Sequence, residues 1–345
     1  MTNGNSAAPL RLALLGAGIA HSLSPVLQAA ALAATGYQGT YTLYDCASEA
    51  AARAVMARVG KDLDGLNVTT PWKGLAAALC QTAPTSPASI NTLWWDAGLR
   101  GTSTDGAGLL AALAQAGLTL QGRTVAVLGL GGAGQALAAA LADQGLARLI
   151  LTSRDPQKLA ATVAQVGAAS PQLALDFVPW GAPVPDSSAL AEADLVVHAT
   201  RLGHGESFLA SPEVRRAEHF TRAAGAWPGP AHDHSLKRAP AGVDLARELA
   251  WLPWAAWAGR GTVLFDSVYA EALTRVQGLA VEHGLGADMR LVPGMGDRDR
   301  PVQGVLVGSG QAMLAHQAAH SFACWTGHLP DGRKLLRTLW RQPRS

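Results

Sequence analysis

The sequence predicts an α/β protein of two domains, an N-terminal α/β domain followed by a doubly wound parallel sheet. Two series of apolar, strand-like runs alternate with Ala- and Leu-rich helical segments, which is the pattern of a parallel sheet covered by helices. The chain has 345 residues, more than the ~250–300 at which a single hydrophobic core stops growing. Its 49% hydrophobic content can fill two cores and argues against a disordered chain.

The first series of elements begins with an apolar strand that ends at Gly16. Pro71, after the third strand of the series, is typical of the first turn of a helix. We expect strands at Leu12–Leu15, Tyr41–Tyr44 and Gly65–Val68, and helices at 25–36 and 49–59.

The second series begins at Arg123, and after it we expect a last long helix, Gln311–Trp325, with no further strand in between. We expect its strands at Thr124–Leu128, Arg148–Thr152, Leu195–Val197 and Thr262–Phe265, and a helix at Ala133–Gln144. We expect a first domain at 10–108, with C-terminal helices at about 308–330 packed on it. We expect a second domain at 120–285, with an insertion at about 203–260. A second insertion follows at 286–307, and the chain ends in a tail at 331–345. Loops as long as these insertions are usually functional or mobile.

Charge, hydropathy and cysteine content exclude several classes of protein. The 27 basic and 25 acidic residues leave a net charge of only +2, which is too small to favour a nucleic-acid partner. Polar residues interrupt the charge-free stretch 12–44 before it reaches the ~20 apolar residues of a membrane span, and the N-terminus is unlike a signal peptide. Cys46, Cys80 and Cys324 lack CxxC spacing, which is typical of free thiols in a reducing cytosol. We therefore expect a cytoplasmic protein with neither nucleic-acid nor membrane partners.

The second series contains a glycine-rich motif, Gly129-Leu130-Gly131-Gly132-Ala133-Gly134, between a strand and a helix. Gly129 allows a tight turn, Gly131 allows the backbone to approach a pyrophosphate, and Gly134 allows close packing of helix on strand. The helix N-terminus presents free N–H groups and the positive end of its dipole to the anion. In this context the motif predicts a Rossmann-type dinucleotide site.

The end of the next strand indicates which dinucleotide is bound. Arg154 suits the 2′-phosphate of NADP, and Lys158 lies one turn further along. Asp155 caps the helix that begins at Pro156, or it binds the ribose of NAD instead. We favour NADP as the cofactor and keep NAD as the alternative.

Polar clusters follow the strands of the first domain. They are His21-Ser22-Leu23-Ser24-Pro25, Asn67-Val68-Thr69-Thr70-Pro71-Trp72-Lys73, Asn91-Thr92-Leu93 and Thr104-Asp105-Gly106-Ala107-Gly108. Open α/β sheets bind ligands at the carboxyl ends of their strands, so these clusters predict a ligand site.

In this order the motifs resemble those of the shikimate dehydrogenase family. Counterparts of its HSxSP, NVTxPxK, NTL, NTDxxG, GxGGA and GxxMLxxQA patterns extend from about Gly16 to Gly327, and NVTxPxK is highly specific. The resemblance implies a substrate domain and a nucleotide domain with a cleft between them. It also implies reversible reduction of 3-dehydroshikimate to shikimate with NADP(H).

The resemblance implies a role for each matching residue. Lys73 and Asp105 would be the catalytic pair, and Ser22 and Ser24 would hold the substrate carboxylate. The other substrate-binding residues would be Asn67, Thr69, Asn91, Tyr269 and Gln317. The cofactor-binding residues would be Gly129, Gly131, Gly132, Ala133, Gly134, Ser153, Arg154, Lys158, His198, Thr200 and Gly310.

The catalytic pair has a chemical rationale. Oxidation of a secondary alcohol needs a hydride acceptor and a base for the hydroxyl proton. A lysine in a partly dry cleft can lose its proton near neutral pH, and a nearby carboxylate orients it. We expect Lys73 to act as the acid–base and Asp105 to orient it. No metal is expected, since His232-Asp233-His234 lacks the distant ligands of a tetrahedral site.

Several departures from the family pattern leave the exact substrate open. Ser103, Ser153 and His198 stand where the family has asparagine, and Ala270 stands where Asn-Pro is common. One alternative is a quinate or aminoshikimate dehydrogenase using NAD or NADP. Another is a non-catalytic sensor that binds the ligand and uses the Trp-rich segment 203–260 to bind a partner. In each case the ligand is a small cyclohexene or cyclohexane carboxylate, and the protein is a monomer or homodimer.

Overall fold

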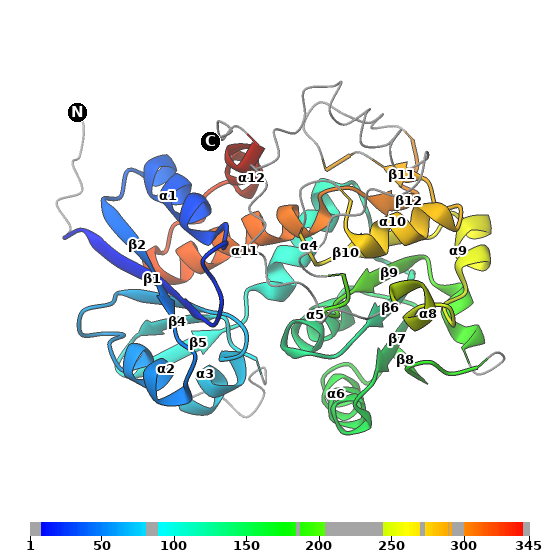
Figure 1. The fold of residues 1–345 in the computed structure, drawn as a ribbon, viewed down its shortest axis with the longest axis horizontal. Helices are drawn as coiled ribbons and strands as arrows, with labels where there is room; N and C mark the ends of the chain where they lie inside the picture. Colours follow the sequence, from blue (N-terminus) through cyan, green and yellow to red (C-terminus); the bar gives the residue numbers. More distant parts are fainter. Residues whose placement is uncertain are drawn as a thin grey trace. The chain divides into compact units, whose positions relative to one another are not determined.

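The computed structural model describes residues 8–80, 89–183, 187–203, 244–269, 273–288, 290–291 and 300–340. The chain forms two compact units, one of residues 1–108 and 314–339 and the other of residues 109–313 and 340–345 (Figure 1). Helices α4 (Asp105–Gln115) and α11 (Ser309–Thr326) both begin in one unit and end in the other. The predicted α/β class is confirmed. In the part of the chain that the structure describes, no helix has the length and hydropathy needed to span a membrane.

The first unit contains a five-stranded sheet in the order β2-β1-β3-β4-β5. Its strands are β1 (Leu10–Gly16), β2 (Gly39–Asp45), β3 (Gly65–Val68), β4 (Thr92–Trp95) and β5 (Leu99–Thr102). β2, β1 and β3 are parallel, as expected. β4 and β5 form an antiparallel hairpin that was not predicted, because the start of β4 was interpreted as part of the polar cluster Asn91-Thr92-Leu93.

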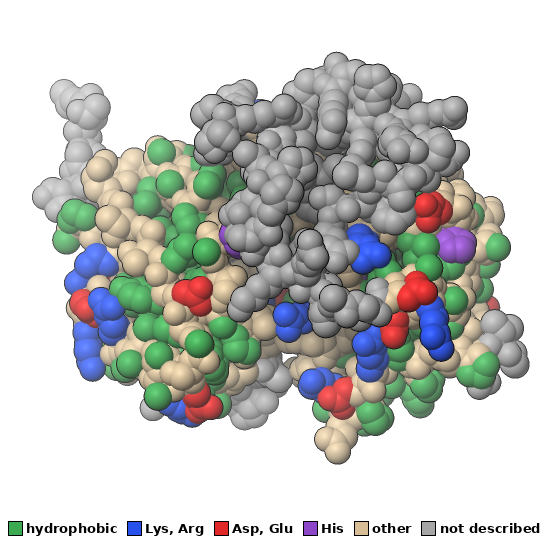
Figure 2. Space-filling view, in the orientation of Figure 1, with side chains coloured by type: hydrophobic (Ala, Val, Ile, Leu, Met, Phe, Trp, Pro, Cys, Tyr) green, Lys and Arg blue, Asp and Glu red, His purple; other side chains and the backbone are tan. Residues whose placement is uncertain are grey.

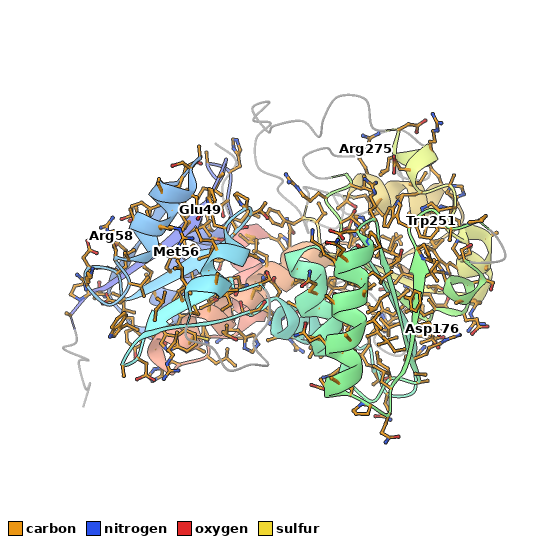
Figure 3. All side chains as sticks on the ribbon, turned by 90° about the horizontal axis from the view of Figure 1, so that it is seen from below. Glu49, Met56, Arg58, Asp176, Trp251 and Arg275 are labelled. Carbon is orange, nitrogen blue, oxygen red and sulfur yellow. The ribbon has the colours of Figure 1, made fainter. Side chains whose placement is uncertain are left out.

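Helices cover this sheet and close a core. They are α1 (Ser24–Thr35), α2 (Glu49–Met56) and α3 (Lys73–Leu79). Helix α12 (Gly332–Trp340) also lies mostly in this unit, where its first residue contacts His316 of α11. Ser48 caps α2 by accepting the N–H of Ala51, which satisfies one free donor of its first turn. Met56, labelled in Figure 3, is buried in this core. Helix α3 begins at Lys73, two residues beyond the predicted start at Pro71.

The second unit contains a seven-stranded parallel sheet in the order β11-β12-β10-β9-β6-β7-β8. Its strands are β6 (Thr124–Leu128), β7 (Arg148–Ser153), β8 (Ala174–Pro179), β9 (Leu195–His198), β10 (Val263–Asp266), β11 (Ala287–Asp288) and β12 (Gly304–Leu306). Without the two-residue β11, this is the 3-2-1-4-5-6 order of doubly wound nucleotide-binding sheets.

The expectation of no strand between the second series and α11 was wrong. β12 pairs with β10, and β11 pairs with β12, both in parallel. Both strands lie in residues 286–307, which were interpreted as an insertion. They were missed because runs of two and three residues show no period, and the polar stretch before Gly304 is typical of a loop.

The tryptophans of residues 244–260 belong to the core of the second unit. This segment forms α8 (Leu245–Glu248) and α9 (Trp254–Arg260), and Trp254 and Trp257 are 4% and 0% exposed. The indole N–H of Trp257 donates to the carbonyl of Leu190 at 2.6 Å. These side chains pack with apolar residues from one face of the sheet, so this part of the supposed insertion covers the sheet. Trp227 and His232-Asp233-His234 lie outside the described residues.

The remaining helices of the second unit contact both ends of its sheet. They are α5 (Gly132–Ala142), α6 (Pro156–Ala169) and α10 (Arg275–Glu282), with the 3-10 helix η1 at Ser188–Glu192. α5 and α6 pack together against β6, β7 and β8, while α10 packs on β10 and β12. Helix α6 begins at the predicted cap, since the Asp155 carboxylate accepts the N–H groups of Gln157 and Lys158.

Surface charge and thiols agree with the composition. Figure 2 shows the described charged side chains of one face as separate groups among uncharged ones. All three cysteines are free thiols, as predicted.

A partly buried histidine on α11 makes the first unit sensitive to acid. Burial, the neighbouring His320 and the charge of Arg333 lower the pKa of His316 from 6.5 to about 4, although Asp331 opposes this. The first residue of α12 abuts the ring, because a Cβ on Gly332 would lie 2.2 Å from its Nδ1. Between pH 6.5 and about 4, the unfolded chain therefore binds a proton here that the folded chain does not.

We expect this histidine to remove on the order of 3 kcal/mol of folding free energy as the pH falls through that range. Urea unfolding at several pH values between 4 and 7 measures the loss. His316→Gln should flatten the dependence, whereas His21→Gln, at an exposed position, should not. An equally steep pH dependence in His316→Gln would contradict the assignment.

Candidate active site

A lysine and an aspartate from the predicted motifs meet in the first unit. The Nζ of Lys73, the first residue of α3, lies 2.6 Å from Oδ2 of Asp105, the first residue of α4. The Asp105 side chain is 1% exposed and that of Lys73 is 17% exposed. The carboxylate is therefore inside the protein, while the ammonium group keeps access to its surroundings.

Two amides hold the other oxygen of this carboxylate. Asn91 donates to Oδ1 of Asp105 at 2.8 Å, and the amide of Gln317 on α11 donates to the same oxygen. Together with Lys73, the two amides give the Asp105 carboxylate three hydrogen-bond donors. These bonds offset the cost of burying the carboxylate and fix its orientation. The structure thus brings together four of the predicted site residues.

Behind this group lies a buried network of amides and hydroxyls. Ser321, one turn after Gln317 on α11, is its centre and is 2% exposed. It accepts from Asn67 at 2.9 Å and lies within hydrogen-bond distance of the hydroxyls of Thr92 and Thr104. Such a satisfied network can hold a site rigid.

The two predicted asparagines are occupied within this network. Asn91 donates to Thr104 as well as to Asp105, and its Oδ1 accepts the N–H of Thr104 at 2.9 Å. Asn67 donates to the carbonyl of Asn91 and to Ser321, and its Oδ1 accepts from Tyr41 at 2.8 Å. Their direct contact with a substrate stays a prediction, and their described contacts position Asp105 and Tyr41.

The two predicted serines lie at the start of α1, after β1. Ser22 accepts the N–H of Ser24 at 3.2 Å, so the two residues form one local turn. The N-cap residue of α1 is Leu23, which has no side-chain acceptor, so the Ser22 hydroxyl is the group that satisfies the N–H of the first helical residue. Burial raises the pKa of the Tyr41 phenol far above its ordinary value, and an interaction with the Ser24 side chain opposes this. The Tyr41 hydroxyl donates to Asn67 at 2.8 Å, which links Tyr41 to the buried network.

Thr69 lies beside the same turn, immediately after β3. Its N–H donates to the carbonyl of Leu15 at 2.8 Å. A Cβ on Gly16 would lie 2.5 Å from the Thr69 methyl group, so the glycine allows this close approach. The carboxyl ends of β1 and β3 thus carry Ser22, Ser24 and Thr69, as expected for a parallel sheet.

Four residues of this network were not predicted: Tyr41, Thr92, Thr104 and Ser321. Thr92 and Thr104 stand inside motifs that had been noted, but no role was assigned to them. Ser321 could have been found from its spacing, because Gln317 and Ser321 are polar residues at i and i+4 on an apolar helix. Tyr41 is one of alternating residues on β2 and carries no such signal.

In the second unit, the glycine-rich turn has the shape that a pyrophosphate requires. Gly129 has φ +96°, which favours glycine, and a Cβ on Gly134 would lie 1.9 Å from the Gly129 carbonyl oxygen. A Cβ on Gly131 would meet nothing within 4 Å, and Gly131 and Gly132 are exposed. No side chain caps α5, so its first N–H groups remain for an anion, with Ala133 beside them. These residues fit a dinucleotide.

The end of β7 holds the residues predicted to select the dinucleotide. The Ser153 hydroxyl accepts the N–H of Asp155 at 3.1 Å. The N–H and the ammonium group of Lys158, together with the N–H of Gln157, hold the pKa of Asp155 below its ordinary value. The Asp155 carboxylate therefore caps α6, while the side chain of Arg154 is 55% exposed.

His198 is buried below the glycine-rich turn with both ring nitrogens bonded. Because the Asp266 carboxylate can only accept, Nδ1 of His198 donates to it at 2.9 Å. Nε2 lies 2.6 Å from the hydroxyl of Thr200, which accepts the N–H of Leu202 at 3.0 Å. Thr200 contacts the turn, since a Cβ on Gly129 would lie 2.5 Å from its methyl group. His198 therefore acts on the turn through Thr200.

Two further predicted residues lie near the end of β10. Burial raises the pKa of the Tyr269 phenol, and its role toward a substrate stays a prediction. Gly310, in the first turn of α11, is required by packing, because a Cβ there would lie 2.3 Å from the Val268 carbonyl oxygen.

Two family models match the chain. Residues 14–93 match the model described as the shikimate dehydrogenase substrate binding domain. Residues 124–220 match the model described as NADP oxidoreductase, coenzyme F420-dependent.

Two relatives that match most of the chain are named shikimate dehydrogenase (NADP(+)). A protein of Symbiobacterium thermophilum named shikimate dehydrogenase (NADP(+)) is 30% identical, over 92% of this chain and 88% of its own. A namesake from Thermus thermophilus is 33% identical, over 93% and 94%. The crystal structure of a shikimate 5-dehydrogenase from Thermus thermophilus with NADP(H) and shikimate has a TM-score of 0.65 at 28% identity, covering 96% of this chain and 99% of that one.

Proposed function

Since the chain belongs to the shikimate dehydrogenase family, we propose that it interconverts 3-dehydroshikimate and shikimate with NADP(H). In this proposal the first unit binds the substrate and the second binds the nucleotide. The observation that carries the proposal is the Lys73–Asp105 pair with its two amide donors. The free thiols support a reducing compartment such as the cytoplasm.

In the proposed reaction Lys73 moves the proton. During oxidation its Nζ accepts the proton of the substrate hydroxyl, and during reduction it returns a proton to the carbonyl oxygen. The nicotinamide, when bound, accepts or supplies the hydride. Asp105 keeps Nζ in one place through the 2.6 Å contact, and Asn91 and Gln317 keep Asp105 in place.

The remaining residues bind and orient. The hydroxyls of Ser22 and Ser24 would hold the substrate carboxylate, and Thr69 would hold a ring hydroxyl. In the second unit the open N-terminus of α5 would hold the pyrophosphate, and Arg154 would hold the 2′-phosphate.

Steady-state assays at 340 nm test this proposal, with shikimate and quinate each combined with NADP⁺ and NAD⁺. We expect the highest kcat/KM with shikimate and NADP⁺. A higher kcat/KM with quinate would show that quinate, and not shikimate, is the substrate. A higher kcat/KM with NAD⁺ would show that NAD is the cofactor. Binding of shikimate without turnover under any combination would support the non-catalytic sensor instead.

A further inference from the structure

The guanidinium of Arg154 is bonded to a residue from a distant part of the chain. One of its terminal nitrogens lies 2.7 Å from Oε2 of Glu248, the last residue of α8. The guanidinium also lies over the ring of Trp180, whose centroid is 5.0 Å from the guanidinium carbon. The Glu248 carboxylate is thus bound to the same guanidinium that, in the proposed function, would bind the 2′-phosphate of NADP.

Aromatic packing holds Glu248 at this place. Trp251, labelled in Figure 3, lies three residues further on, and its indole N–H donates to the Glu248 carbonyl at 3.1 Å. Trp251 packs edge-on against Trp180, with ring centroids 5.3 Å apart at 63°. Both indoles pack on the core of the second unit. The end of α8 is therefore fixed beside Arg154 by packing, independently of the ion pair.

Asp155 directly follows Arg154 in the sequence, but its carboxylate is not available to pair with the Arg154 guanidinium. It accepts the N–H groups of Gln157 and Lys158 and pairs with the Lys158 ammonium group at 3.2 Å. Moving it would uncap α6. Of these two carboxylates, Glu248 is the one that can change its partner.

We propose that Glu248 determines how strongly this protein prefers NADP over NAD, an inference that rests on the proposed dinucleotide site. A carboxylate and a 2′-phosphate compete for one guanidinium, and each repels the other. NAD carries no 2′-phosphate, so it leaves the Arg154–Glu248 pair intact. Glu248 therefore raises the Kd for NADP and leaves the Kd for NAD unchanged. The difference in affinity between the two cofactors becomes smaller.

Equilibrium titration with NADP⁺ and NAD⁺, followed by tryptophan fluorescence at low salt, tests the inference on Glu248→Gln. We expect the Kd for NADP⁺ to fall about three- to tenfold, and the Kd for NAD⁺ to change less than twofold. Raising the salt concentration should reduce the difference, because both groups are partly exposed.

Two further variants separate this role from a general change of charge or structure. Glu192→Gln is the matched control, since Glu192 forms a 2.7 Å pair with Arg148 in the same unit. It should leave both Kd values unchanged. In the Arg154→Leu background, Glu248→Gln should no longer tighten NADP⁺ binding by more than about twofold, because the shared guanidinium is gone. Glu248→Ala serves as the second variant if Glu248→Gln unfolds.

Three results would overturn the inference. They are an unchanged or higher Kd for NADP⁺ in both Glu248 variants, an equal change for NAD⁺, and the same gain in Glu192→Gln. A wild-type protein that binds neither dinucleotide would overturn the proposed function as well, so the two failures are distinguishable.

Discussion

Lys73→Met is expected to lower kcat for shikimate oxidation by about 10²–10⁴-fold, which is the usual contribution of a positioned acid–base. The variant keeps the apolar stem of the side chain and removes the group that moves the proton. The KM for shikimate should change much less, since the predicted carboxylate contacts of Ser22 and Ser24 remain. Initial rates at saturating NADP⁺ measure the effect.

The fold should survive this substitution. Asp105 keeps the donors Asn91 and Gln317, so we expect a loss of about 1–3 kcal/mol in unfolding free energy rather than collapse. Lys61→Met is the control, because Lys61 is an exposed lysine of the same unit. Near-normal turnover by a folded Lys73→Met variant would show that Lys73 is not the acid–base of the reaction.

His198→Leu is expected to lower the free energy of unfolding by about 2–4 kcal/mol, because two buried groups, Asp266 and Thr200, each lose a hydrogen-bond partner, while Asp266 keeps the Val268 N–H and the Thr274 hydroxyl. His198 and Asp266 are both 0% exposed, and the pair is bonded at 2.9 Å. Urea unfolding monitored by circular dichroism measures the loss. The Kd for NADP⁺ should also rise, since Thr200 would lose the contact that fixes it beside Gly129.

The conservative variant His198→Asn keeps a donor at this position and should recover part of the lost stability. Combining His198→Leu with Asp266→Asn should cost less than the sum of the two single losses, because both substitutions remove the same hydrogen bond. Strict additivity, or a loss below about 1 kcal/mol in His198→Leu, would show that the pair contributes little.

Sequence patterns were sufficient where a local rule sets the structure. Buried strands of five or six residues, such as β6 and β7, were located within one residue. The place of Asp155 before Pro156 predicted a helix cap, with ribose binding as the alternative, and the structure shows the cap. β12 was missed because three residues show no period. α8 and α9 were missed because the core they complete comes from distant strands.

The same division applies to the site. Lys73 and Asp105 stand in motifs and were named in advance, and the structure places them in contact. Glu248 could not be found from its neighbours, since 94 residues separate it from Arg154. The spacing of residues predicts contacts within a helix or a strand pair, and long-range side-chain partners need the fold.

Most of α11 belongs to the first unit although it lies near the C-terminal end of the sequence, and this affects how the unit folds during synthesis. Trp325 of α11 donates to the Leu93 carbonyl at 3.0 Å, and Gln28 donates to the Ala318 carbonyl at 3.2 Å. During synthesis Ala318 and Trp325 are added more than two hundred residues after Gln28 and Leu93. Until then we expect the amide of Gln28 and the carbonyl of Leu93 to be hydrogen-bonded to water. Products truncated before residue 314 would lack Gln317 and Ser321, so we expect these products to be inactive.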